Sequence, residues 1–197
     1  MMRAIHTLGV IVALLLLGSV AAAAQTEDPV NWYGTLGYSK LDGSQLTLGA
    51  ATGRVGARFG DYFGAEGELS LGVDTDHFIY FPPCFGPICS LAIFRVNSRL
   101  SNAEGLYGVG YLPIVPDLDL FARAGYGFSR YSAAHTFFGG YDEQSFNYGA
   151  GGQMFFDGAD GIRLDYTRQS ATSQTRPGRE AIGNNADIWS VSFVRRF

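Results

Sequence analysis

Apolar and polar side chains alternate along most of this chain, and the alternation is clearest between Gly53 and Leu71. Two runs flank a short turn at residues 60–62, and each run has one apolar or small face and one face that carries charge. Successive side chains of a strand point to opposite faces, so the pattern predicts a β-hairpin. Such a hairpin suits a soluble sandwich, whose ionic face meets water, or a transmembrane barrel, whose apolar face meets lipid.

Eight segments follow this alternation, and no convincing amphipathic helix separates them. We predict strands at residues 32–41, 53–59, 63–71, 101–112, 118–130, 145–156, 162–167 and 187–197. In the fourth segment we assign Glu104 to the charged face, and Tyr107, Val109 and Tyr111 to the apolar face. At about 10 residues a strand, the chain is long enough for eight membrane-spanning strands.

The lengths of the connections favour one of the two architectures. The connections after the second, fourth and sixth segments are short, whereas those at residues 42–48, 74–100, 131–144 and 169–186 are longer. A transmembrane barrel sorts its connections into short periplasmic turns and long external loops, and a sandwich has no reason to do so. We therefore predict an all-β fold, an eight-stranded antiparallel up-and-down transmembrane β-barrel.

The first 24 residues have the features of a secretory signal peptide, namely Arg3, an apolar core at residues 8–20 and four alanines before Gln25. A membrane anchor is the alternative, but a spanning helix needs about 20 apolar residues and this core is shorter. We expect cleavage after Ala24, which leaves residues 25–197 as one exported barrel domain.

Composition agrees with a barrel and argues against one class of partner. Glycine accounts for 27 of the 197 residues, aromatic residues for 14% and charged residues for 16%. Glycine-rich and aromatic-rich strands with few charges suit a lipid-facing wall. Loss of Arg3 with the signal peptide lowers the basic residues from 14 to 13, against 18 acidic residues, so the net charge becomes −5. This mild acidity argues against a nucleic-acid partner.

Four stretches carry a resemblance to a known family: GRVGARFGDYFGAEGELSLG, GLYGVGYLPIVPDLDLFARAGYGFSRY, GIRLDYTR and the terminal Phe197. They resemble the outer-membrane β-barrel domain family, that is, the small OmpA/OmpX-type barrels of the porin family. The resemblance implies a cell-envelope protein in the outer membrane of a Gram-negative bacterium. It also implies that the barrel-assembly machinery reads the last strand through Trp189, Val191, Phe193 and Phe197. Arg195 stands where that pattern has an apolar or aromatic residue.

The charged faces of the predicted strands point into the lumen. They contribute four basic and four acidic residues: Arg54, Arg58, Glu66, Glu68, Glu104, Arg123, Arg163 and Asp165. An eight-stranded barrel is narrow, so side chains fill its interior, and charges buried there must pair. We predict an ionic network that plugs the lumen. The alternative is a narrow gated pore for ions or small solutes, opened by re-pairing of these charges.

A second set of charges lies in or beside the long connections: Arg95, Arg99, Arg130, Arg168, Arg176 and Arg179. A guanidinium binds phosphate through two hydrogen bonds, so these residues are candidate contacts for the phosphates of lipopolysaccharide. The alternative is that they pair with acidic loop residues or stay solvated, since exposed charges are common.

The connection at residues 74–100 has the most distinctive composition. It holds the chain's two cysteines, Cys84 and Cys89, and export to an oxidising compartment favours a small disulfide between them. A metal site with His77 as third ligand is the rival interpretation, but the usual set of four ligands is incomplete, and we expect no metal. The apolar side chains around residues 78–85 either fold over the barrel mouth or form an adhesive patch for a surface ligand.

Catalysis is the last class of function to consider, because some small outer-membrane barrels modify lipids. The lipid A deacylase family, which is similar in size, needs a His-x-Ser pair and a later glutamate. Here Phe137 stands two positions after His135, in place of that serine, although Glu143 and Ser145 lie nearby. No phosphate loop, dinucleotide motif or zinc spacing occurs, so we expect neither an enzyme nor a cofactor. We therefore predict a structural or surface-interaction role through the external loops, with the pore and then a lipid A-modifying enzyme as alternatives.

Overall fold

The computed structural model describes residues 30–44, 46–80, 94–133, 140–174 and 185–197. In these ranges the chain forms nine β-strands: β1 (Asn31–Asp42), β2 (Thr47–Phe59), β3 (Phe63–Gly72), β4 (Asp76–Tyr80), β5 (Phe94–Val115), β6 (Leu118–Ala133), β7 (Tyr141–Phe155), β8 (Asp160–Gln174) and β9 (Asn185–Arg196). The same ranges contain no helix that is long and apolar enough to cross a membrane. The predicted signal peptide lies outside them.

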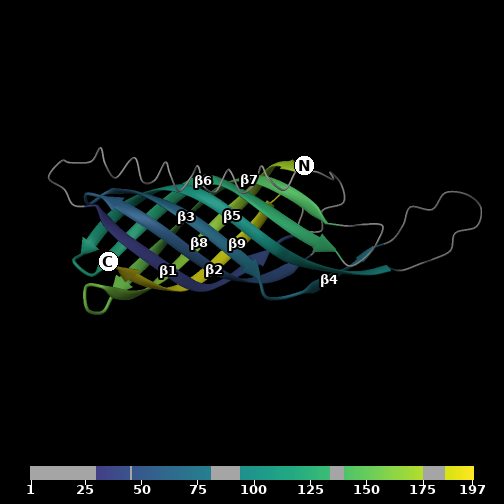
Figure 1. Cartoon of the computed structure of the whole chain (residues 1–197), viewed down its shortest axis with the longest axis horizontal. Coiled ribbons are helices and arrows are strands. Elements are labelled where there is room, and N and C mark those ends of the chain that lie inside the picture. The colour runs from purple at the N-terminus through teal and green to yellow at the C-terminus, as the bar shows by residue number, and fades with distance from the viewer. Residues whose placement is uncertain (1–29, 45, 81–93, 134–139, 175–184) are drawn as a thin grey trace, which may run out of the picture.

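Eight of these nine strands close into a ring, whose arrangement Figure 1 shows. The order around the sheet is β3-β2-β1-β9-β8-β7-β6-β5, neighbouring strands are antiparallel, and β3 pairs with β5 to complete the circle. β4 stands outside the ring, because it extends along β5 beyond the end of β3. The prediction of an eight-stranded antiparallel up-and-down barrel is confirmed, with β4 as an added strand.

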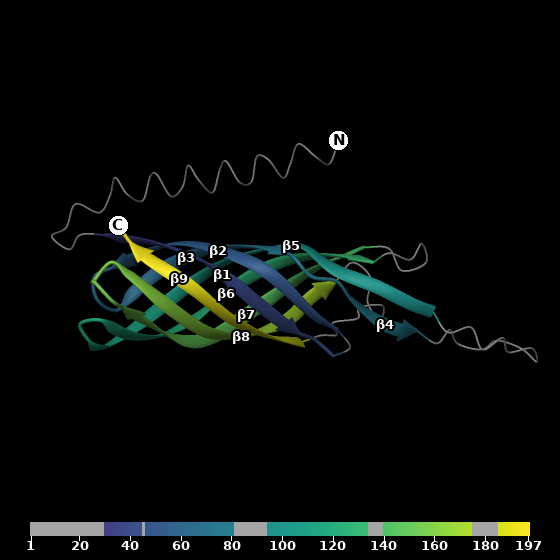
Figure 2. The same ribbon diagram turned by 90° about the horizontal axis from the view of Figure 1, so that it is seen from below.

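The two ends of the ring differ. At one end, which we call the turn end, short connections join β2 to β3, β5 to β6 and β7 to β8, and the chain ends there at Phe197 (Figure 2). Two of these turns contain Gly60 and Gly158, whose positive φ angles of 62° and 81° favour glycine. The opposite end, which we call the loop end, carries the remaining connections and β4.

The strands extend further toward the loop end than the sequence predicts. Residues 74–100, which we expected to be a loop, include β4 and the first part of β5. The connection from β1 to β2 covers only residues 43–46 rather than 42–48. β4 and the start of β5 therefore form a hairpin that projects beyond the ring (Figures 1 and 2).

The outer wall of the ring is apolar, as the alternation predicts. Large apolar side chains are exposed on all eight of its strands, for example Leu36, Val55, Leu69, Leu106, Leu120, Met154, Leu164 and Val191. A lipid environment covers such a surface, whereas a water-soluble protein rarely exposes so large an apolar band.

The assignment of faces in the fourth predicted segment is wrong. Three side chains that we placed on the lipid side point inward and are buried: Tyr107, Val109 and Tyr111. Leu106 and Leu112 face outward instead, and they are 66% and 56% exposed. A β-bulge between Leu100 and Asn102 shifts the register of β5, so its inward positions are even-numbered before the bulge and odd-numbered after it.

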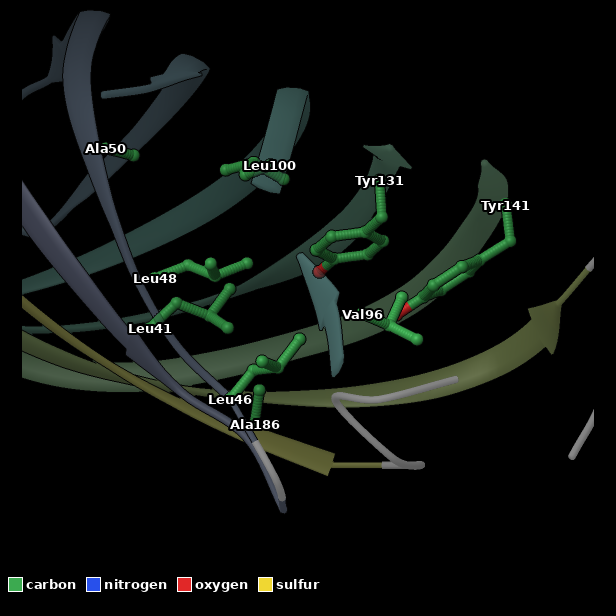
Figure 3. Close-up of a cluster of buried hydrophobic side chains, with 9 residues drawn as sticks. All are labelled: Leu41, Leu46, Leu48, Ala50, Val96, Leu100, Tyr131, Tyr141 and Ala186. Atoms are coloured by element: carbon green, nitrogen blue, oxygen red, sulfur yellow. The ribbon is translucent and has the colours of Figure 1, made fainter. Parts of the chain in front are cut away.

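Side chains fill the lumen in layers. Nine apolar side chains form what we call the loop-end cluster, and in Figure 3 they point toward one another: Leu41, Leu46, Leu48, Ala50, Val96, Leu100, Tyr131, Tyr141 and Ala186. Next toward the turn end come hydrogen-bonded hydroxyl groups, such as Ser39 and Thr52 at 2.8 Å, and then buried charges. A second apolar cluster lies on the turn side: Tyr33, Tyr107, Val109, Tyr111, Phe121, Phe155 and Val194.

Candidate functional site

Glu66 is the centre of an ionic network inside the barrel. Its side chain is fully buried, and its carboxylate accepts hydrogen bonds from Arg123 Nη1 at 2.8 Å and from Arg163 Nη1 at 2.7 Å. The hydroxyl of Tyr33 donates a third hydrogen bond to Glu66 at 2.9 Å. These donors satisfy a charge that would be very costly to bury alone.

Arg54 joins this centre to a second pair of carboxylates. Its Nε donates to Glu68 at 2.6 Å, and its Nη1 donates to Asp165 at 3.1 Å. Arg123 also contacts both carboxylates, Glu68 at 2.8 Å and Asp165 at 3.4 Å. We call this set the central network, and it comprises Arg54, Arg123, Arg163, Glu66, Glu68 and Asp165. Three positive and three negative charges balance within it, as burial in a low dielectric requires.

Aromatic side chains complete the packing around the central network. The guanidinium of Arg123 lies over the ring of Tyr107, 4.3 Å from its centroid, and that of Arg163 lies over Phe121 at 3.9 Å. The hydroxyl of Tyr111 donates to that of Tyr33 at 2.7 Å, which extends the hydrogen-bonded chain from Glu66. The alternation along the strands did not identify these tyrosines, because it placed Tyr107 and Tyr111 on the lipid side.

Arg58 belongs to a separate cluster at the turn end rather than to the central network. Its Nη1 donates to Asp119 at 2.9 Å, and Asp119 also accepts from Arg196 at 2.8 Å and from Gln153 at 3.0 Å. Asp119 was not among the predicted lumen charges, although it has the same parity as the inward-facing Arg123 on β6. The strand parity alone was enough to find it.

The prediction that Glu104 belongs to the lumen network is wrong. Glu104 lies on the exposed outer side of β5, where its carboxylate accepts a hydrogen bond from Asn102 at 3.2 Å. The bulge in β5 and the packing of Tyr107 into the lumen together set this orientation. Of the eight predicted lumen charges, six therefore meet in the central network, Arg58 lies apart, and Glu104 lies outside.

A small cavity separates the central network from the loop-end cluster. Its volume is about 30 Å³, and its lining includes Glu68, Ser70, Tyr107, Asn147 and Gln169. A volume of this size holds about one or two water molecules. Apolar side chains of the loop-end cluster, among them Leu41 and Leu100, complete the lining.

The loop-end arginines fall into two groups. Arg130 pairs with Asp142 at 3.0 Å, and Arg168 pairs with Asp187 at 2.6 Å. Arg95 and Arg99 are exposed on the outer side of β5, and no carboxylate of the described ranges lies within ion-pair distance of either. Arg176 and Arg179 lie outside those ranges.

Asp76 ties the β4–β5 hairpin to β2. Its carboxylate accepts the backbone N–H of Thr47 at 2.9 Å and that of His77 at 2.7 Å. These two donors, that of Thr47 foremost, hold the pKa of the Asp76 carboxyl below its ordinary value. Cys84, Cys89 and the apolar residues 81–85 lie outside the described residues, so the predicted disulfide stays a prediction.

The contact between Asp76 and Thr47 is expected to depend on pH. Because the pKa of Asp76 is lowered in the folded protein, the contact stabilises the hairpin above the ordinary carboxyl pKa of about 3.9, and this contribution is lost as the pH falls through the lowered value. The chemical shift of the Thr47 amide proton, followed by NMR in micelles, should titrate in that range. The titration should disappear in Asp76→Asn and persist in Asp74→Asn.

The residues considered for catalysis do not form a catalytic site in the described ranges. Glu143 and Ser145 are buried in the lumen, where Glu143 accepts a hydrogen bond from Gln169 Nε2 at 2.6 Å. His135 lies outside the described residues. In the part of the chain that the structure describes, no three histidine, cysteine or acidic side chains are grouped so as to hold a metal ion.

Three residues of the predicted assembly signal share the outer face of β9, and the fourth, Phe197, directly follows the strand. Trp189, Val191, Phe193 and Phe197 are all exposed on the lipid side. Arg195 shares this face and lies 3.5 Å from Asp160 of β8. A charged side chain near the turn end is tolerated, because it lies close to the membrane interface.

Comparisons with known structures find barrels of the same fold. The crystal structure of Ail, the attachment invasion locus protein of Yersinia pestis, in complex with the heparin analogue sucrose octasulfate matches with a TM-score of 0.53 and 13% identity, over 85% of this chain and 99% of that one. The outer membrane protein OprG of Pseudomonas aeruginosa matches with a TM-score of 0.59 and 10% identity, over 88% and 98%. The N-terminal β-barrel domain of OprF from the same organism gives 0.54 and 10%, over 87% and 100%.

The sequence itself was compared with curated proteins and with family models. The search of the curated proteins finds no match. The model of the outer membrane protein beta-barrel domain matches residues 10–197, nearly the whole chain. Together with the closed ring of strands and its apolar outer wall, this match indicates the outer membrane. The chain belongs to the outer membrane protein β-barrel domain family.

Proposed function

We propose that this protein is a closed outer-membrane barrel that acts through its loop end, as a surface-interaction protein rather than as a pore. The observation that carries the proposal is the filled lumen, in which the central network and the loop-end cluster lie one after the other. A solute that crossed the barrel would have to separate ion pairs whose disruption costs about 3–5 kcal/mol each. It would also have to pass an apolar constriction, which excludes water and ions.

The β4–β5 hairpin is the most suitable surface for a ligand. It projects from the loop end, and Arg95 and Arg99 stand on its outer side without a carboxylate partner in the described ranges. Two guanidinium groups on the same side of one strand, four residues apart, favour an anionic ligand with several sulfate or phosphate groups. The sulfated sugar bound by Ail supports this class of ligand, and lipopolysaccharide phosphates have the same chemistry.

The double variant Arg95→Gln/Arg99→Gln tests this role. We expect its affinity for a fluorescent heparin-like polysaccharide, measured on proteoliposomes, to fall about ten-fold, since each exposed charge contact contributes about 1 kcal/mol or less. Arg130→Gln/Arg168→Gln is the matched control, because these two arginines already pair with Asp142 and Asp187. Equal losses in the two double variants, or no loss in the first, would contradict the role of the hairpin.

Two further parts of the proposal concern biogenesis and chemistry. We infer that the barrel-assembly machinery recognises the outer face of β9, which presents Trp189, Val191 and Phe193 in alternation.

We also infer that the protein is not an enzyme, and this is supported by the burial of Glu143 and Ser145 in the lumen. Unchanged lipid A in a mass spectrum after overexpression would agree with that inference, and a new lipid A species would contradict it.

A further inference from the structure

A groove crosses the outer wall of the barrel over β1, β9, β8 and β7, on the side nearer the loop end. Its volume is about 490 Å³, and its lining includes Tyr38, Lys40, Ala150, Leu164, Tyr166 and Trp189. The strand register explains its shape. Lys40, Trp189 and Tyr166 lie opposite one another in one row, and Tyr38, Val191 and Leu164 form the next row toward the turn end.

Large side chains form the walls of this groove and small ones form its floor. The rings of Tyr166 and Trp189 pack together with their centroids 4.8 Å apart. Ala150 lies directly opposite Tyr166 on β7, and its neighbour is Gly151. The volume lies within the range of 300–1,000 Å³ that is typical of ligand sites. An extended apolar chain therefore fits over Ala150, beside the packed rings of Tyr166 and Trp189.

The groove presents one charge to the outside. Lys40 is the only lysine of the chain, and its side chain is 51% exposed. Asp165 also lines the groove, but its carboxylate is buried on the lumen side, where Arg54 binds it. The ammonium group of Lys40 therefore gives the loop-end rim of the groove a positive charge.

The present partner of Lys40 is easily exchanged. Lys40 Nζ donates to Asp42 at 3.0 Å in an exposed ion pair, and such pairs contribute about 1 kcal/mol or less. Asp42 also accepts a hydrogen bond from Thr47 Oγ1 at 2.9 Å, so it keeps a partner when the ammonium group turns away. A lipid phosphate at the membrane surface can then take the place of the Asp42 carboxylate.

We propose that this groove is a binding site for an anionic, phosphate-bearing membrane lipid. One acyl chain lies over Ala150 beside the packed rings of Tyr166 and Trp189, and the phosphate binds the ammonium group of Lys40. The site is distinct from Arg95 and Arg99 on β5, and it does not depend on the function proposed for the hairpin.

The two tryptophans of the chain allow a direct test. Trp32 lies near the turn end and Trp189 lines the groove, so Trp32→Phe leaves Trp189 as the only reporter. We would refold this variant into phosphatidylcholine liposomes that contain small amounts of a brominated lipid, since bromine quenches tryptophan on contact. We expect brominated phosphatidylglycerol to be about five-fold more effective than brominated phosphatidylcholine, which matches about 1 kcal/mol for one lysine near an anionic headgroup.

Matched variants identify the cause of any preference. Lys40→Gln in the Trp32→Phe background should remove the preference, and Ala150→Phe should reduce it by filling the groove. Arg130→Gln removes another exposed, ion-paired cation of the outer wall, on β6, and should leave the preference unchanged. Trp189→Phe, which reports from Trp32, should give none.

Several results would overturn the proposal. They are an equal response to both lipids, a preference that survives Lys40→Gln, and an equal preference at Trp32. Loss of quenching on addition of inorganic phosphate would also overturn it, because the site would then bind the free anion and not the lipid. Heat-dependent gel mobility of each variant establishes that the barrel is folded in every sample.

Discussion

Replacing Glu66 with alanine is expected to lower the free energy of unfolding by about 3–5 kcal/mol. The carboxylate of Glu66 is fully buried between Arg123 and Arg163. Its removal takes the 2.7 Å contact from Arg163, whose other carboxylate, Asp165, lies 3.5 Å away, and a 2.8 Å contact from Arg123. Glu68 and Asp165 offset only part of this loss, because they already bind Arg54. Urea titration of the refolded barrel in lipid vesicles, followed by tryptophan fluorescence, measures the difference.

Glu104→Ala is the matched control for this prediction. It removes the same side chain from the outer side of β5, where Glu104 only accepts a hydrogen bond from Asn102. The expected change is within about 0.5 kcal/mol, as for surface substitutions in general. Similar losses for Glu66→Ala and Glu104→Ala would mean that the central network does not stabilise the barrel.

Asp119→Ala is expected to cost about 2–3 kcal/mol, the second largest effect. The substitution takes the shared acceptor away from Arg58, Arg196 and Gln153 at the turn end. The loss is smaller than for Glu66, because Arg58 and Arg196 are partly exposed and water can solvate them. The same urea titration measures it.

Asp142→Ala provides the comparison for Asp119. Asp142 also pairs with an arginine, Arg130, but on the exposed outer wall, where an ion pair contributes about 1 kcal/mol or less. If Asp119→Ala were no more destabilising than Asp142→Ala, burial would not explain the contribution of the turn-end cluster to the free energy of unfolding.

The fold could be predicted from the sequence because each strand of the barrel shows its two environments directly. A lipid-facing side and a charged lumen side give a clear alternation, as in Ile162, Arg163, Leu164 and Asp165 of β8. Short turns with Gly60 and Gly158 mark one end of the barrel. Seven lumen charges, the six of the central network and Arg58, could be assigned in this way without any knowledge of how the strands are arranged.

The lumen-facing and lipid-facing residues of β5 could not be predicted in the same way. Glycines and large apolar residues occur on both of its faces, and the bulge after Leu100 inverts the parity along the strand. A tyrosine side chain can face lipid or fill a narrow lumen. Its hydroxyl group favours the lumen only when a hydrogen-bond acceptor such as Glu66 or Glu68 lies there. These partners lie on other strands, so the local pattern gave the wrong side.

The contacts between distant strands could also not be predicted from the sequence. Arg54 and Asp165 meet across the lumen, although 111 positions separate them. The outer groove likewise depends on register, because Lys40 of β1 comes to lie opposite Trp189 of β9. A one-residue shift in pairing would move both side chains to other neighbours.

The conductance of the refolded barrel in a planar lipid bilayer tests the central claim, that the lumen is closed. We expect no steady conductance from the wild-type protein, because the central network and the loop-end cluster fill the interior. Heat-dependent gel mobility of the same sample would establish that the inserted protein is folded. A steady single-channel conductance that changes in Arg123→Ala would contradict the account, and it would make the inward-facing charges the functional site of a pore.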